Sequence, residues 1–510
     1  MKNFLTDYFT DSMFSLPMAK PIVCVFFVAA VTFFFSVALS VAMLFFIFLF
    51  CLTLAALLKL KVAKKELLAL LVIGLLVHMG IAFLISIPGV NLVGGGADYE
   101  SYHMMAREIA QRASVGSFSL HGVRGGHDFT LLVGAAYSLF YPDILIGKVL
   151  ILWFFCLSLI FSYLIIVEMG GSAKIAFWTG ILISLYPSYL FFGNLLLKDT
   201  IVTPLVLLAL LICLKMLREF SWVKFLLFFI ILVGIIHLRF YIGYSLMFSF
   251  LVSWFLVANF KRKMLYGLYI FFLLGFAPYV LGSGYYGVDV LREFINPDRI
   301  TIYREIAYNP GSPNNENVDP ILPGQPIPVK KNQNDIPLSQ NPPPQSAPIV
   351  AENQNTNLPA ASPPIESVPS GFGSSFVVET GLKNGAGAFV KNSIASFGYG
   401  LLGPFPWQLR YKRQYVALFE TIPWYLIWAF FLYSFLTCVK ERNIIRLANE
   451  KKFSILLIIF AVLAMGGLSL FINNYGIIVR IRIPIVISLL IAGCVVFNNY
   501  LEKLPWLKNI

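Results

Sequence analysis

Long apolar runs recur along the chain, and they constrain its fold more than any other feature. The first run covers residues 21–58, whereas a single membrane-spanning helix needs only about 20 residues. Of the 510 residues, 58% are hydrophobic and only 12% are charged, and a soluble protein of this length would carry about a quarter charged residues. We therefore expect an all-α polytopic membrane protein.

The apolar runs predict about twelve transmembrane helices. Run 21–58 accommodates two helices with a turn near Ser36–Ser40, and if it holds only one, the N-terminus lies on the other side of the membrane. The remaining spans are predicted at 66–87, 146–168, 174–191, 199–216, 222–238, 241–259, 264–282, 421–439, 453–472 and 479–498. Residues 129–141 are apolar but too short to span, which favours a re-entrant or interfacial piece.

Clusters of basic residues predict the orientation of these spans. Lysine and arginine concentrate on the cytoplasmic side of membrane proteins. The basic clusters are Lys59–Lys65, Lys215–Lys224, Lys261–Lys263 and Lys440–Lys452, and they fall in alternate loops. Both termini are then inside, and the other loops face outward, as in a bacterial inner-membrane protein with its site on the periplasmic side. Because loop topology explains most of the net charge of +13, we expect no nucleic-acid partner.

The chain divides into successive segments by composition. Residues 1–65 hold the two N-terminal spans and a basic loop, 66–283 a transmembrane core, 284–420 an external loop, and 421–510 the last three spans. Within the external loop, residues 309–370 are rich in Pro, Asn, Gln and Ser, a composition that predicts disorder.

The first candidate for chemistry follows the span that ends near residue 87. Three glycines, Gly94–Gly96, permit a turn, and Asp98 is a natural N-cap for a helix over Tyr99–Arg112. The apolar side chains of this helix share one face, so we expect it to lie flat on the membrane surface and to hold the Asp98 carboxylate at the lipid boundary. That face comprises Tyr102, Met105, Ala106 and Ile109.

Two further stretches place charges beside the apolar core, where a charge needs a partner or a task. Lys198 and Asp199 stand where the chain re-enters the bilayer, and Arg480 and Arg482 stand at a late outward helix end. Asp199 has an alternative explanation as a cap and helix-dipole partner, and the arginines have one as snorkelling side chains. Arg239 is a weaker case of the same kind.

A polar cluster near residue 124 leaves three interpretations open: a divalent-metal site, polar contacts to substrate, or a plain exposed loop. It comprises His121, Arg124, His127 and Asp128, and its spacing matches no specific metal motif. We therefore assign no residue to a metal and name no cofactor. The six cysteines all lie in apolar runs and form no metal or redox motif.

These stretches together resemble the GT-C glycosyltransferases, membrane enzymes that use polyprenyl-phosphate sugars and include the protein mannosyltransferase and aminoarabinose transferase types. The resemblance rests on the helix from Asp98 to Arg112, on Lys198-Asp199, and on the sequence Arg480-Ile481-Arg482-Ile483-Pro484. It covers residues 66–240 and, more loosely, the last two spans. The first loop of that family often carries Asp-Glu, whereas here Tyr99 follows Asp98.

The resemblance implies transfer of a sugar from a polyprenyl-phosphate donor to a glycan, lipid or protein acceptor. In this interpretation Asp98 takes the proton of the acceptor hydroxyl, and Asp199 orients Lys198 or the acceptor. Cationic side chains stabilise the departing phosphate, and aromatic or polar ones contact the sugars. The first group is Lys198, Arg480 and Arg482, and the second is Tyr99, Tyr102, His103, Arg124 and Trp407.

Other functions remain open at this stage. A Wzy-type polysaccharide polymerase or O-antigen ligase also has about a dozen spans, and it would yield a ladder of repeat units rather than a single-sugar product. A lipid-linked glycan transporter or flippase would show inverted repeats and charges at mid-span, whereas the charges here gather at helix ends. A non-catalytic scaffold that presents the Pro- and Asn-rich loop is a further alternative.

Overall fold

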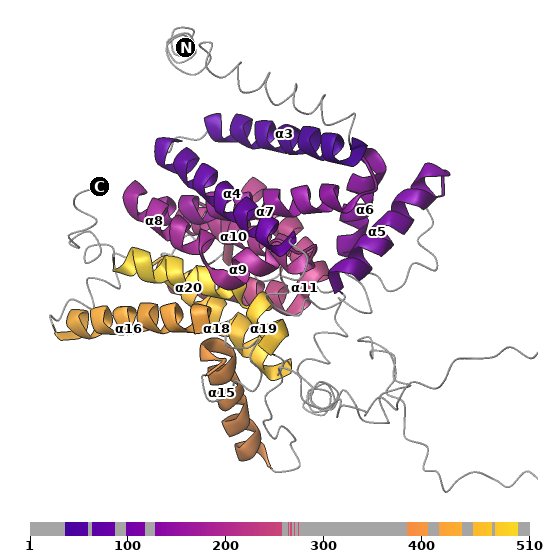
Figure 1. The fold of residues 1–510 in the computed structure, drawn as a ribbon. Helices are drawn as coiled ribbons and strands as arrows, with labels where there is room; N and C mark the ends of the chain where they lie inside the picture. The colour runs from indigo at the N-terminus through magenta and orange to yellow at the C-terminus, as the bar shows by residue number, and fades with distance from the viewer. Residues whose placement is uncertain are drawn as a thin grey trace, which may run out of the picture.

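The computed structural model describes residues 36–59, 64–86, 98–117, 128–257, five positions between 264 and 274, and residues 385–405, 418–440, 452–471 and 475–497. Within these ranges every regular element is a helix (Figure 1). The helices are α3 (Val37–Leu58), α4 (Lys64–Ser86), α5 (Asp98–Ser114), α6 (Asp128–Leu139), α7 (Ile144–Glu168), α8 (Ala173–Ser184), α9 (Pro187–Phe192), α10 (Lys198–Arg218), α11 (Trp222–Val257), α15 (Ala386–Leu402), α16 (Leu418–Lys440), α18 (Ser454–Phe471), α19 (Tyr475–Ile481) and α20 (Ile483–Val496).

Five helices of the described residues are long and apolar enough to cross a membrane, namely α3, α4, α7, α10 and α11. The expected helical membrane protein is confirmed to that extent, and the total of about twelve spans stays a prediction. The boundary expected near Ser36–Ser40 is present, because Ser36 caps α3 by accepting a hydrogen bond from the backbone N–H of Leu39. The predicted span before it, the span at 264–282 and the Pro-rich segment 309–370 lie wholly or mostly outside the described residues.

Helix α11 folds back on itself at Arg239. The backbone of this residue is non-helical, with φ −152° and ψ 83°. Side chains from the two arms meet, since the ring centroids of Phe228 and Phe250 lie 5.2 Å apart. Phe220, just before the first arm, lies 5.7 Å from Trp254 of the second arm. α11 is therefore a helical hairpin, and the sequence prediction of two helices broken at this point is confirmed.

Helix α10 lies at the centre of the bundle. It packs against α7 on one side and against the α11 hairpin on another, and α11 packs in turn against α18. α10 runs from Asp199 at one end to Arg218 at the other, a separation of about 28 Å at 1.5 Å per residue. At the far end Arg218 pairs with Glu168, with Nη1 3.0 Å from Oε1. These two ends of α10 define the two ends of the bundle.

The outer helices expose apolar side chains in a way that suits contact with lipid. Leu76 and Phe83 of α4 are exposed, as are Phe419, Leu426 and Tyr433 of α16, a helix that extends from the side of the bundle in Figure 1. Large apolar patches of this kind mark membrane or protein contacts. α16 covers the span predicted at 421–439.

Helix α5 begins at Asp98, as the sequence predicts, but protein covers its apolar face. Tyr102, Ala106 and Ala110 are buried and pack with Phe129 and Val133 of α6. Protein thus covers part of the face that the sequence predicts to lie on the membrane surface, and the position of α5 relative to a membrane stays a prediction. Helix α6, which contains most of the short apolar piece expected at 129–141, supplies the surface that covers this face.

Gly134 of α6 lies tightly against α5, and it yields a test of this packing. A Cβ atom there would lie 2.9 Å from Ile109 Cβ and 3.3 Å from Ala106 O, with little room for either to move. We expect Gly134→Ala to destabilise the α5–α6 pair by about 1–3 kcal/mol, the usual effect of overpacking. Limited proteolysis of α5 in detergent measures it. Gly234→Ala, where a Cβ meets no atom within 4 Å, is the control, and equal protease resistance of both variants would contradict the packing.

Candidate functional site

Asp199 lies in the first turn of α10, and its side chain is only 6% exposed. The N-terminus of a helix favours a negative charge, which explains part of its placement. The N-cap residue of α10 is Leu197, which makes no side-chain capping hydrogen bond. The acidic group in the first turn of α10 is therefore Asp199. A carboxylate buried this deeply still requires close hydrogen-bonding partners.

Two arginines from distant parts of the chain supply these partners. Arg239, at the turn of the α11 hairpin, holds Asp199 in bidentate fashion, with Nε 2.8 Å from Oδ1 and Nη2 2.9 Å from Oδ2. Arg480, in the last turn of α19, places Nε 3.6 Å from Oδ2. The side chains of Arg239 and Arg480 are 15% and 17% exposed. We call these three residues the Asp199 cluster.

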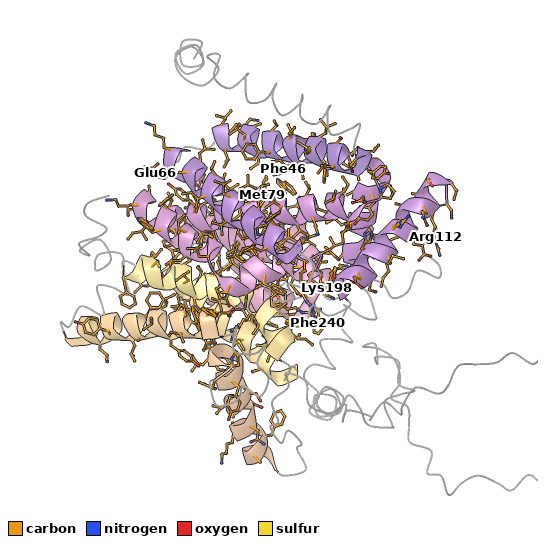
Figure 2. All side chains as sticks on the ribbon, in the orientation of Figure 1. Phe46, Glu66, Met79, Arg112, Lys198 and Phe240 are labelled. Atoms are coloured by element: carbon orange, nitrogen blue, oxygen red, sulfur yellow. The ribbon has the colours of Figure 1, made fainter. Side chains whose placement is uncertain are left out.

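The surroundings of the Asp199 cluster are cationic and aromatic. Among the described residues, the charged side chains within electrostatic reach of Asp199 are Arg239, Arg480 and Lys198, and all three are positive. Tyr241 and Tyr102 lie within electrostatic reach of Arg239. Figure 2 labels Lys198 and Phe240, the chain neighbours of Asp199 and Arg239, at the same end of the bundle. The arrangement is an electropositive site, which suits an anionic ligand.

Arg482, which the sequence predicts to stabilise the donor phosphate, lies in a different environment from Arg480. It is 1% exposed, and its Nη1 donates to the carbonyls of Gly400 at 3.0 Å and Gly403 at 2.6 Å. Its Nη2 donates to Glu420 Oε1 at 2.7 Å. Carbonyls at a helix C-terminus lack partners and attract cations, so Arg482 completes the end of α15.

Glu420, in the first turn of α16, is the centre of this second network. It accepts hydrogen bonds from the Tyr186 hydroxyl at 2.8 Å, from the backbone N–H of Ser188 at 3.1 Å, and from the Ser188 hydroxyl. Trp424 and Tyr425 of α16 also donate to the last carbonyls of α15. We call Arg482, Glu420, Tyr186 and Ser188 the Glu420 network, and it fastens α9, α15, α16 and α20 together.

The other described site candidates lie on α5 and have protein partners. The Tyr99 hydroxyl donates to Glu100 at 2.8 Å, and this hydrogen bond, more than burial, raises the pKa of Tyr99. Tyr102 is buried with its ring 5.2 Å from that of Phe129, so it packs inside the protein where a sugar-stacking role was predicted. His103 Nδ1 lies 2.9 Å from the Tyr137 hydroxyl, and burial lowers the pKa of His103.

Several predicted residues are not placed by the structure. The side chain of Asp98, and residues Arg124 and Trp407, lie outside the described residues. His121 and His127 of the polar cluster lie there too. Among the described residues, no group of three or more His, Cys, Asp or Glu side chains could hold a metal ion.

Sequence reasoning undervalued Arg239 and missed Glu420. Arg239 is a charged residue between two apolar runs. A charge in that position indicates that a partner of opposite charge lies nearby in the fold. Glu420 stands just before the apolar run 421–439, as the last residue of the external loop that the sequence predicts. Charges at both positions adjoin the apolar core, and the sequence does not show which partner each one meets.

Comparisons with protein-family models, with curated proteins and with solved structures found no match to this chain.

Proposed function

We propose that the chain is an integral membrane glycosyltransferase that moves a sugar from a polyprenyl-phosphate carrier to an external glycan, lipid or protein acceptor during envelope or exopolysaccharide biosynthesis. The Asp199 cluster is the observation that carries the proposal. It gathers half-buried cations at one end of an apolar helical bundle, where the phosphate of a lipid-linked sugar would lie while its polyprenyl tail contacts the apolar helices.

The Asp199 cluster provides what a phosphate leaving group needs. A guanidinium group carries five N–H donors in a planar fork, and Asp199 engages two of those of Arg239. In this role Asp199 orients the arginines, and it does not act as a base because both its oxygens face guanidinium groups. Cations fixed in advance in a water-poor site stabilise a developing charge more strongly than mobile ones in water.

The reaction balances without a further reactant. The acceptor oxygen attacks the anomeric carbon as the bond from that carbon to the phosphate oxygen breaks, and the electron pair stays on the phosphate. Arg480 and Lys198 stabilise this phosphate. The proton of the acceptor hydroxyl goes to Asp98, the base that the sequence predicts. The acceptor approaches from the outer side, where the helix α5 begins.

The test of this function is transfer by the purified protein in liposomes, with a supplied mixture of glycan, lipid and peptide acceptors and synthetic polyprenyl phosphates that carry glucose, mannose, galactose or aminoarabinose. We expect release of polyprenyl phosphate from at least one donor, and a roughly 100-fold or larger loss in kcat for Arg480→Gln, because a charge-stabilising donor is removed. Arg218→Gln, at the opposite end of α10, is the matched control and should retain transfer.

The products separate this proposal from its alternatives. A wild-type protein that cleaves none of these donors, or an Arg480→Gln variant as active as Arg218→Gln, would contradict the proposal. A ladder of repeat units from lipid-linked oligosaccharides would point instead to a Wzy-type polymerase or ligase. Movement of intact donor across the bilayer would point to a flippase.

A further inference from the structure

Tyr241 brings a hydroxyl group to the Asp199 cluster, and the chemistry above does not use it. It stands two residues after Arg239, at the start of the second arm of α11. Its ring packs against the core and meets the ring of Phe240 edge to face, with the centroids 5.3 Å apart. Helix α18 adjoins it, since a Cβ atom at Gly467 would lie 4.0 Å from the Cβ atom of Tyr241. The ring is therefore held in place by its neighbours.

The hydroxyl group of Tyr241 lies among the charges of the Asp199 cluster. It is within electrostatic reach of all three members, Arg239, Asp199 and Arg480. It is also within hydrogen-bonding reach of the Arg239 guanidinium, although no hydrogen bond of good geometry joins the two. Because a guanidinium carries donors and no acceptor, Arg239 cannot accept a hydrogen bond from Tyr241 in any orientation.

The O–H group of Tyr241 is thus a donor that lacks an acceptor. Its oxygen is shielded from solvent and has no hydrogen-bond partner among the described residues. Asp199, the carboxylate of the cluster, does not accept from it, and both of its oxygens already face the guanidinium groups of Arg239 and Arg480. Shielded polar groups without partners are few in folded proteins, and a ligand that supplies the missing partner is one explanation.

The charges around Tyr241 indicate the chemistry of that ligand. The described charged side chains within electrostatic reach of Asp199 are three cations, so Asp199 and its neighbours together carry a net positive charge. An anion is favoured in such surroundings. The oxygens of a phosphate group accept hydrogen bonds from O–H and N–H donors alike, and their charge complements arginine and lysine. A neutral hydroxyl of a sugar would supply an acceptor for Tyr241 but no charge for the cations.

We propose that Tyr241 is a phosphate-binding residue, whose hydroxyl donates a hydrogen bond to an oxygen of the phosphate that Arg480 and Lys198 stabilise. The phosphate is the headgroup of a polyprenyl lipid, because the cluster joins the ends of α10 and of the arms of α11, helices apolar and long enough to cross a membrane. The inference rests on the proposed function for this lipid. Phosphate binding can be measured without sugar or acceptor, so the two proposals can fail separately.

The experiment is thermal unfolding of the detergent-purified full chain over a range of concentrations of farnesyl phosphate, with farnesol and inorganic phosphate as separate arms. A ligand that binds the folded state raises the melting temperature. We expect farnesyl phosphate to raise that of the wild type more than either other compound does. Tyr241→Phe should bind farnesyl phosphate about 10-fold or more weakly, because a hydrogen bond to a charged acceptor is lost.

A tyrosine at the opposite end of the bundle provides the matched control for binding. Tyr163 is buried in α7, within electrostatic reach of Glu66 at the start of α4 and on the same helix as Glu168, the partner of Arg218. Tyr163→Phe removes the same atom far from the cluster and should bind farnesyl phosphate as the wild type does.

The stability of the proteins without ligand separates binding from a structural role. Tyr241→Phe should melt no lower than the wild type, because the hydroxyl that it removes lacks an acceptor. Tyr189→Phe should melt lower, because it loses a hydrogen bond to Ser158 of 2.6 Å. A lower melting temperature for Tyr241→Phe would mean that its hydroxyl already has a partner within the protein, and would overturn the inference.

The binding results decide the rest. Equal affinity of Tyr241→Phe and Tyr163→Phe for farnesyl phosphate would overturn the inference, as would a wild type that farnesyl phosphate does not stabilise. Equal stabilisation by inorganic phosphate would overturn the assignment to a lipid headgroup. Binding of farnesyl phosphate that depends on Tyr241, in a protein that transfers no sugar, would support the inference and contradict the transferase proposal alone.

Discussion

The Glu420→Ala variant is expected to unfold far more readily than the wild type, with a loss of about 3–5 kcal/mol, the usual effect of removing one partner from a buried ion pair. Arg482 would stay 1% exposed with its charge uncompensated, and Tyr186 and Ser188 would lose their acceptor. Since folded proteins are stable by only about 5–15 kcal/mol, a loss of this size should strongly reduce the yield of folded protein.

Thermal unfolding in detergent, together with membrane yield, measures the effect of Glu420→Ala. Glu108→Gln is the control, because the pair of Glu108 with Arg112 is 46% and 31% exposed and such surface pairs contribute at most about 1 kcal/mol. A double variant, Glu420→Ala with Arg482→Met, should recover part of the loss because no unpaired charge remains. Equal melting temperatures for Glu420→Ala and Glu108→Gln would show that Glu420 does not hold these helices together.

The Asp199→Asn variant should lose both stability and transfer. The neutral amide cannot compensate two guanidinium groups that are 15% and 17% exposed, so we expect a loss of about 3–5 kcal/mol. Transfer should fall by roughly 100-fold or more, because the arginines that stabilise the leaving phosphate lose the group that positions them.

A second variant separates these two effects of Asp199. Asp199→Asn combined with Arg239→Gln removes a carboxylate and a guanidinium together, so melting temperature should recover while transfer stays low. Asp143→Asn, which keeps a side-chain oxygen for the N-cap of α7, is the control and should change stability by about 1 kcal/mol or less. Full transfer by the double variant would mean that the Asp199 cluster only supports the fold.

The sequence predicts the helices well because their signal is local. The length and apolar content of residues 64–86, 144–168 and 198–218 decide that each is a helix, whatever it packs against. The break at Arg239 is predicted for the same reason, since a charge interrupts two apolar runs. Packing between helices is not local, and this is why the α6 surface that covers α5 was not predicted.

The pairing of charges is the part that the sequence could not supply. Arg480 and Arg482 are two residues apart and look equivalent in the sequence, yet Arg480 faces Asp199 while Arg482 faces Glu420. Successive residues of a helix turn by about 100°, so side chains two positions apart point in nearly opposite directions. The spacing thus predicts that the two arginines separate, but only the fold shows which carboxylate each one meets.

The hairpin of α11 also bears on how the chain is assembled in the membrane. Arg239, at the turn of the hairpin, follows Asp199 by 40 residues in the chain. α10 has therefore been synthesised before Arg239 is added. Moving a guanidinium group across the lipid interior is energetically costly, and pairing with the Asp199 carboxylate that is already present lowers that cost. The order of the two partners along the polypeptide therefore favours insertion of α10 and the following pair of helices as one cooperating unit rather than helix by helix.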